Sequence, residues 1–161
     1  MYFKKKFLIG KKTQKICNKY KTKFLINDDV LLANRLNSDG CHLGQKDMKI
    51  LKARKILKKK IIGVTCHNSI KLAKLAIKNK ADYLAFGAFN PSKTKRTRFK
   101  ANLTLLKKIT KITKTPVVAI GGIDSENYKK LLLNKANFLA ISGYIWNNKK
   151  LKPIEAIRKL K

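Results

Sequence analysis

The stretch Val117-Val118-Ala119-Ile120-Gly121-Gly122-Ile123-Asp124 decides the fold class of this chain. Its four apolar residues predict a buried strand, the two glycines predict the end of that strand, and Asp124 predicts the cap of a following helix. A strand, a glycine turn and a helix start leave backbone N–H groups at a point of positive potential, which suits a phosphate group. The same pattern is typical of an ordinary β–α turn, and this stretch alone leaves both interpretations open.

Strand-like and helical patterns alternate along the whole chain. Strands are predicted at residues 23–27, 39–43, 60–65, 82–87, 116–120 and 137–142. Helices are predicted at 11–21, 29–36 and 49–58, after a cap at Asn68 or Ser69, after Asn102, from Asp124 and from near Pro153. Because the strands are apolar on both faces, they predict a parallel sheet covered by helices, in one domain over residues 1–161. An open doubly wound sheet and a TIM-type barrel lacking two of its eight strands both fit this pattern.

The composition excludes several classes of protein. With 161 residues, 44% of them apolar and 30% charged, the chain is long enough for one soluble domain with its own core. No apolar run approaches the roughly 20 residues that span a bilayer, and the amino-terminal residues lack a signal-peptide pattern. Cys17, Cys41 and Cys66 match neither a disulfide framework nor a zinc site. We therefore expect reduced, buried cysteines, a cytoplasmic location and no membrane partner.

The formal net charge of +32 raises the question of nucleic-acid binding. The lysines are spread along every predicted helix, however, and no nucleic-acid-binding motif accompanies them. We interpret most of this charge as solvated helix surface and expect no nucleic-acid partner. Such a surface still attracts anionic substrates.

Acidic side chains gather after two adjacent predicted strands. The chain has only 8 acidic residues, yet Asp28, Asp29 and Asp47 all follow these strands. In both candidate folds the site lies at the carboxyl ends of the strands. Mg²⁺ typically takes one or two carboxylates together with waters and phosphate oxygens, so these residues predict a Mg²⁺ site. The alternative for each of them is the capping of a following helix.

A polar loop follows the fourth predicted strand. Ser92, Thr94 and Lys95 place two hydroxyl groups and a positive charge in this loop, which suits a phosphate group. A metal site, this loop and the Gly121-Gly122 turn together predict two phosphorylated small-molecule substrates.

The histidines and cysteines give weaker signals for catalysis. His42 lies in a predicted strand and His67 in the loop after one, and we interpret both as structural. Cys66 and His67 resemble a nucleophile pair, but adjacent residues at the end of a strand usually point apart. We therefore do not assign them a catalytic role.

Six blocks of residues, in this order and spacing, resemble the thiamine phosphate synthase family. The blocks are Ile26–Asp28, Asp39–Asp47, Gly63–His67, Asp82–Gly87, Pro91–Lys95 and Ala119–Ile123. The resemblance runs from about Lys11 to the carboxyl terminus. It implies a TIM (β/α)8-type barrel that joins hydroxymethylpyrimidine diphosphate to thiazole phosphate and releases diphosphate in thiamine biosynthesis.

The resemblance implies roles at the diphosphate end of the site. Asp28 and Asp47 would hold Mg²⁺, and Asn27 would contact the diphosphate side of the pyrimidine substrate. Lys95 would be the catalytic residue that stabilises the departing diphosphate. Thr65 stands where the family usually has serine, so the hydroxyl group for the substrate is kept.

The resemblance also implies a site for the thiazole phosphate. Ser92 and Thr94 correspond to loop hydroxyl groups that touch this phosphate, with Ser92 in place of the usual threonine. Gly122, Ile141 and Ser142 would complete the site.

The chain departs from the family pattern at its amino-terminal end. The resemblance implies two further strands before the Asn27-Asp28 strand, the second ending in Gln-x-Arg-x-Lys, and no residues here supply them. We therefore expect a barrel that lacks its first two strands, with about six parallel strands and surrounding helices, and an inactive truncated barrel is one alternative. A related thiazole tautomerase is another, although Ala88 lies where that enzyme uses a histidine. A basic nucleic-acid-binding module is the third.

Overall fold

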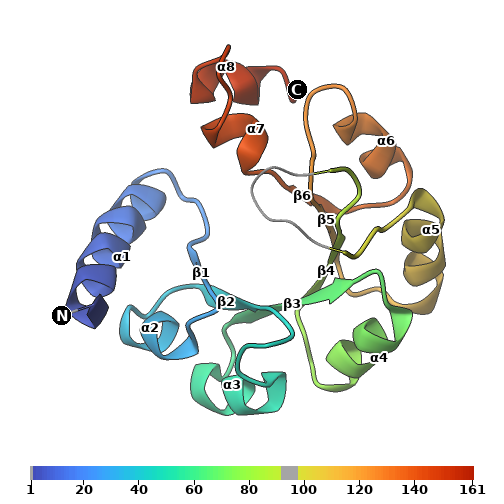
Figure 1. Cartoon of the computed structure of the whole chain (residues 1–161). Helices are drawn as coiled ribbons and strands as arrows, with labels where there is room; N and C mark the ends of the chain where they lie inside the picture. The colour runs from blue at the N-terminus through green and yellow to red at the C-terminus, as the bar shows by residue number, and fades with distance from the viewer. Residues whose placement is uncertain (1, 92–97) are drawn as a thin grey trace. The chain divides into compact units, whose positions relative to one another are not determined.

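The computed structural model describes residues 2–91 and 98–161, which form two compact units (Figure 1). The first unit contains the described residues up to Thr65 together with Lys78–Asp82. The second unit contains Cys66–Ile77 and the described residues from Tyr83 onward.

The first unit is built on three parallel strands. Its elements are α1 (Tyr2–Lys19), β1 (Leu25–Asn27), α2 (Val30–Arg35), β2 (Gly40–Leu43), α3 (Ile50–Leu57) and β3 (Ile61–His67), the last two residues of which belong to the second unit. β2 lies between β1 and β3, with Asn27 beside His42 and His42 beside Gly63. This register brings the carboxyl ends of the three strands to one edge of the sheet.

The second unit repeats the same plan. Its elements are α4 (Ile70–Lys78), β4 (Tyr83–Gly87), α5 (Leu103–Ile112), β5 (Val117–Ile120), α6 (Tyr128–Leu133), β6 (Phe138–Ala140), α7 (Gly143–Trp146) and α8 (Pro153–Arg158), with Lys78 counted in the first unit. β5 lies between β4 and β6, and Ile120 pairs with Gly87 on one side and with Ala140 on the other. The predicted alternation of strands and helices and the predicted parallel pairing are confirmed.

Three of the predicted helix caps are present, and one is not. The Asp29 carboxylate accepts the Leu32 N–H at 3.0 Å, as a cap does. The side chains of Ser69 and Asn102 cap α4 and α5 in the same way. The prediction for Asp124 was wrong. Its carboxylate accepts two N–H groups of a short turn, and α6 begins only at Tyr128.

The first helix is longer than its sequence pattern predicted. Helix α1 begins at Tyr2, not near Lys11, and continues through Gly10. Gly10 is buried, and a Cβ atom there would collide with the Leu36 side chain. Glycine therefore permits the close approach of α1 to the end of α2, which outweighs its weak helix propensity. The outer face of α1 is apolar in part, since Leu8 and Ile16 are both 59% exposed.

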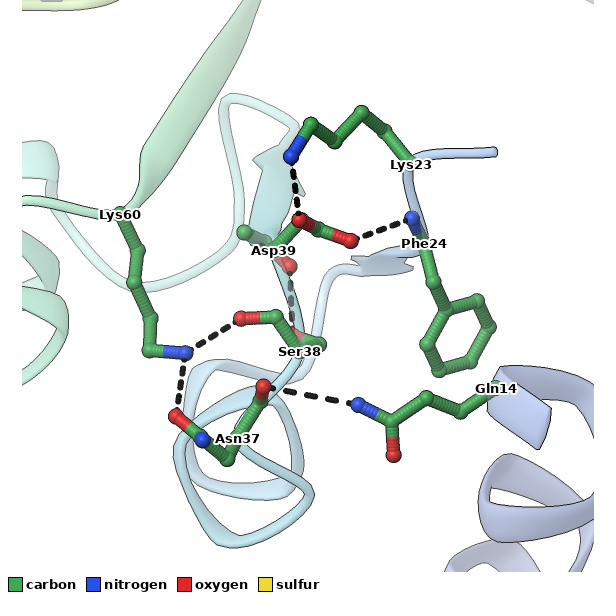
Figure 2. Close-up of polar contacts among 8 residues, drawn as sticks. Gln14, Lys23, Phe24, Asn37, Ser38, Asp39 and Lys60 are labelled. Atoms are coloured by element: carbon green, nitrogen blue, oxygen red, sulfur yellow. Dashed lines mark hydrogen bonds and ion pairs between the residues drawn. The ribbon is translucent and has the colours of Figure 1, made fainter. Parts of the chain in front are cut away.

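Polar contacts tie together the amino-terminal ends of the strands in the first unit (Figure 2). The Asp39 carboxylate accepts the Phe24 N–H and the Lys23 ammonium group, each at 2.9 Å. The Lys60 ammonium group donates to the Asn37 side chain at 2.7 Å and to the Ser38 carbonyl. Because Phe24 precedes β1, Asp39 precedes β2 and Lys60 precedes β3, this network aligns the three strands at the edge opposite to their carboxyl ends.

Replacement of Asp39 by asparagine should make the free energy of unfolding less dependent on pH in the acidic range. The Phe24 N–H and the Lys23 ammonium group hold the pKa of Asp39 below its ordinary value of 3.8. The carboxylate therefore contributes its full stability above about pH 4, and this contribution is lost as the pH falls through the lowered pKa. We expect Asp39→Asn to lose about 1–2 kcal/mol at pH 7 and less at pH 2.5. Urea denaturation of both proteins at these two pH values measures the difference, and an equal loss at both would contradict it.

Candidate active site

The end of β1 places Asn27 and Asp28 beside β2. Asn27 is the register partner of His42, and the Asp28 N–H donates to the His42 carbonyl at 2.8 Å. Asp28 has a φ of 67°, in the left-handed region, which aspartate adopts more readily than most residues. Both side chains are exposed at the carboxyl edge of the sheet.

The loop after β2 holds Asp47 in place. The Gly44 N–H donates to Asp47 Oδ2 at 2.6 Å, and the Asp47 N–H donates back to the Gly44 carbonyl at 3.3 Å. A Cβ atom on Gly44 would lie 2.9 Å from the same oxygen, so the loop needs glycine for this close approach. Asp47 does not cap α3, since the residue at the cap position is Lys49. The capping alternative is therefore confirmed for Asp29 and excluded for Asp47.

Three aspartates contribute to the pKa of one buried thiol, that of Cys41. Burial raises the pKa of the Cys41 thiol to about 12, and the negative charges of Asp28, Asp29 and Asp47 contribute to the rise. The backbone places these carboxylates along one edge, since Asp28 and Asp29 follow β1 and Asp47 lies in the loop after the neighbouring strand β2. Cys41 stays protonated there and is not a nucleophile at neutral pH.

His42 and Thr65 form a polar contact at the same edge. His42 Nε2 lies 2.8 Å from Thr65 Oγ1, and the Gln45 side-chain amide donates to the Thr65 carbonyl. Burial lowers the pKa of His42, and the negative charge of Asp47 opposes this effect. The imidazole is therefore neutral at pH 7 and orients the Thr65 hydroxyl group, in keeping with its structural interpretation.

Cys66 and His67, in the second unit, do not form a nucleophile pair. Burial raises the pKa of Cys66 to about 12. The His67 ring stacks on Phe99, with 4.0 Å between the ring centroids. All three cysteines are free thiols, and Cys17 is half-buried where we had expected burial.

The Gly121-Gly122 turn has the backbone that only glycine adopts readily. The φ angles are 100° at Gly121 and 61° at Gly122. A Cβ atom on Gly122 would lie 2.7 Å from the main-chain carbon of Asn90 and still closer to the Pro91 carbonyl oxygen. The Asn127 side chain donates to the Gly122 carbonyl at 2.9 Å and fixes the turn. Among the described residues, no hydrogen bond uses the Gly122 N–H.

Ile141 and Ser142 emerge beside this turn. Because Ile120 and Ala140 are register partners, Gly122 and Ser142 each lie two residues beyond a matched position of parallel strands. Ser142 is exposed and precedes the short helix α7, which the sequence pattern did not predict, and its side chain makes no capping hydrogen bond. Both residues are therefore placed at the carboxyl edge of the second unit together with Gly122.

The structure thus brings the predicted residues together within each unit. Asn27, Asp28, Asp47 and Thr65 share the edge of the first unit. Ser92, Thr94 and Lys95 lie outside the described residues, so their predicted roles stay predictions. Within the described ranges, no group of three or more histidine, cysteine or acidic side chains has the arrangement of a metal site. Gln45, which contacts the Thr65 carbonyl, received no role in the sequence analysis, although it belongs to the block Asp39–Asp47.

A family model described as thiamine monophosphate synthase matches residues 4–145. The chain belongs to the thiamine monophosphate synthase family. It is 75% identical to a thiamine-phosphate synthase of Pelagibacter ubique over 156 residues. This aligned segment covers 97% of this chain and 75% of that protein. A thiamine-phosphate synthase of Nitrosococcus oceani is 41% identical, over 89% of this chain and 66% of its own length.

A solved member of the family has the same fold. The thiamine phosphate pyrophosphorylase from Pyrococcus furiosus matches with a TM-score of 0.89 and 30% identity, over 98% of this chain and 75% of that one. The expected TIM-type fold is confirmed. The expectation of a thiamine phosphate synthase, an enzyme of the transferase class, is confirmed by the family model and the relatives. The chain spans between 66% and 75% of the length of these three relatives. None of the helices in the described part of the chain is both long and apolar enough to cross a bilayer.

Proposed function

We propose that this chain joins hydroxymethylpyrimidine diphosphate to thiazole phosphate and releases diphosphate, in the cytoplasm and without nucleic-acid or membrane partners. One observation carries the proposal. The Gly44 N–H fixes the Asp47 carboxylate at 2.6 Å, in a loop where Asp47 caps no helix and follows the strand that pairs with the strand before Asp28. A carboxylate held in this way, at the carboxyl edge of parallel strands, is suited to binding a cation.

The donor set fits Mg²⁺. Asp28 and Asp47 supply two carboxylates, and Mg²⁺ takes its remaining ligands from water and phosphate oxygens. Asp28 is exposed and Asp47 is half-buried, so neither carboxylate is sealed in the core. When bound, Mg²⁺ supplies positive charge to the diphosphate as the bond to it breaks.

The residues of the chain then bind and orient the two substrates. Asn27 and the Thr65 hydroxyl group hold the pyrimidine substrate, and Lys95 stabilises the leaving diphosphate. The C–O bond to diphosphate breaks with its electron pair on the oxygen. The thiazole nitrogen forms the new C–N bond to the same methylene carbon, which bears positive charge. Cys41 and Cys66 stay protonated, in agreement with direct transfer between the substrates.

The thiazole phosphate has its own set of donors. The Gly122 N–H, which donates to no other described residue, and the Ser142 hydroxyl group lie at the edge of the second unit, where a phosphate would accept hydrogen bonds. Ile141, which directly precedes Ser142, forms part of the same site. The hydroxyl groups of Ser92 and Thr94 complete the set of donors. A thiazole tautomerase would not need the carboxylates Asp28 and Asp47, which favours the synthase.

Removal of the metal tests the proposal. The chain is incubated with both substrates and Mg²⁺, with both substrates and a chelator, or with either substrate alone, and thiamine phosphate is measured by chromatography. We expect product only when both substrates and Mg²⁺ are present, and recovery when Mg²⁺ is added back to the chelated sample. Product that forms equally well under chelation would overturn the metal assignment. Conversion of the thiazole phosphate alone would favour the tautomerase.

A further inference from the structure

Lys6 belongs to no role described above, yet it lies at the acidic edge of the first unit. It comes from the first two turns of α1, which lies beside β1 in Figure 1. Its Nζ atom is 3.7 Å from Asp29 Oδ2, and the two side chains are 40% and 31% exposed. Asp29 directly follows Asp28, so this cation lies next to the proposed metal ligands.

In this ion pair the Asp29 carboxylate has a second, backbone contact. The other oxygen of Asp29 accepts the Leu32 N–H at 3.0 Å and thereby anchors the carboxylate to α2. A separation of 3.7 Å is longer than that of a charge-assisted hydrogen bond. Partly exposed ion pairs of this kind contribute little to stability, so exchange of one anion for another costs little.

The charge of the site requires a further cation. Asp28 and Asp29 follow β1 and Asp47 follows the neighbouring strand β2, so three negative charges lie along one edge, and a diphosphate brings more. A divalent ion and the Lys95 ammonium group assigned above together offset only three of these charges. A flexible ammonium group at the rim is suited to phosphate as a point charge with three donors.

We propose that Lys6 binds the diphosphate of the pyrimidine substrate and exchanges the Asp29 carboxylate for a phosphate oxygen. This proposal rests on the proposed function, because it assumes that the diphosphate lies at the edge formed by Asp28 and Asp47. It makes Lys6 a substrate-binding residue that no sequence motif indicated.

Two lysine variants and a neighbouring control test this role. Binding of inorganic diphosphate in the presence of Mg²⁺ is measured by calorimetry for the unmodified chain, Lys6→Ala, Lys6→Arg and Lys5→Ala. Lys5 is the adjacent lysine and is exposed, so its removal changes the net charge equally. We expect Lys6→Ala to weaken diphosphate binding about tenfold and Lys6→Arg to retain it within about threefold. We expect Lys5→Ala to bind like the unmodified chain.

A kinetic measurement separates binding from structural damage. Lys6→Ala should raise KM for hydroxymethylpyrimidine diphosphate and leave KM for thiazole phosphate unchanged, with an unaltered melting temperature. Equal weakening by Lys6→Ala and Lys5→Ala would show a general charge effect, and no weakening by either would also overturn the role of Lys6. If the unmodified chain itself binds no diphosphate, the proposed function fails and not only this inference.

Discussion

Asp47→Asn should lower the rate of thiamine phosphate formation by about 100-fold or more, a loss typical of removing one strong electrostatic contact from a site. Asparagine keeps an oxygen that accepts the Gly44 N–H, so the loop after β2 is expected to survive. Only the negative charge that would hold Mg²⁺ is lost. Steady-state rates over a range of Mg²⁺ concentrations measure the effect, and high Mg²⁺ should restore part of the activity.

The control for this prediction is Glu126→Gln, which removes an exposed carboxylate in the second unit. It should leave the rate and its Mg²⁺ dependence unchanged. Melting curves of both variants show whether the fold is intact. An Asp47→Asn protein that is folded and fully active at low Mg²⁺ would remove Asp47 from the metal site.

Gly122→Ala should damage the Gly121-Gly122 turn of the second unit. Alanine at a φ of 61° is strained, and its Cβ atom would meet the main chain of Asn90 and Pro91, which cannot move aside as a flexible side chain does. We expect a loss of about 1–3 kcal/mol in the free energy of unfolding. If this turn binds the thiazole phosphate as proposed, KM for thiazole phosphate should rise at least about tenfold, because the substitution displaces the Gly122 N–H.

Ser125→Ala is the matched control, since it changes the side chain of a half-buried residue three positions further on. It should alter neither stability nor KM. The measurement is urea denaturation together with kinetics at varied thiazole phosphate. A Gly122→Ala protein with unchanged KM for thiazole phosphate would show that this turn is an ordinary β–α turn.

The sequence pattern predicted the strands well, because each one is a short apolar run between polar residues. Helix starts were predictable where a side chain caps the helix, as with Asp29 and Asn102. Asp124 is an aspartate like Asp29, but it closes a turn four residues before the first residue of its helix, a difference that depends on the path of the loop. The early start of α1 could not be predicted, because Gly10 is tolerated only through its packing against Leu36.

The candidate site was predictable to the extent that it lies at strand ends. Asp28 and Asp47 follow adjacent strands, and their proximity follows from parallel pairing. Which of the aspartates caps a helix needed coordinates, since Asp29 and Asp47 look alike in the sequence and only Asp29 caps one. Lys6 could not be found from the sequence, because its position depends on how α1 packs beside β1.

The most direct test of the central claim follows both phosphorus-containing products at once. Phosphorus NMR of the chain with hydroxymethylpyrimidine diphosphate, thiazole phosphate and Mg²⁺ reports the diphosphate released and the thiamine phosphate formed. We predict that the two appear in equal amounts, and that Asp47→Asn slows both by the same factor. Release of diphosphate without thiamine phosphate, or no change of either substrate under these conditions, would contradict the claim.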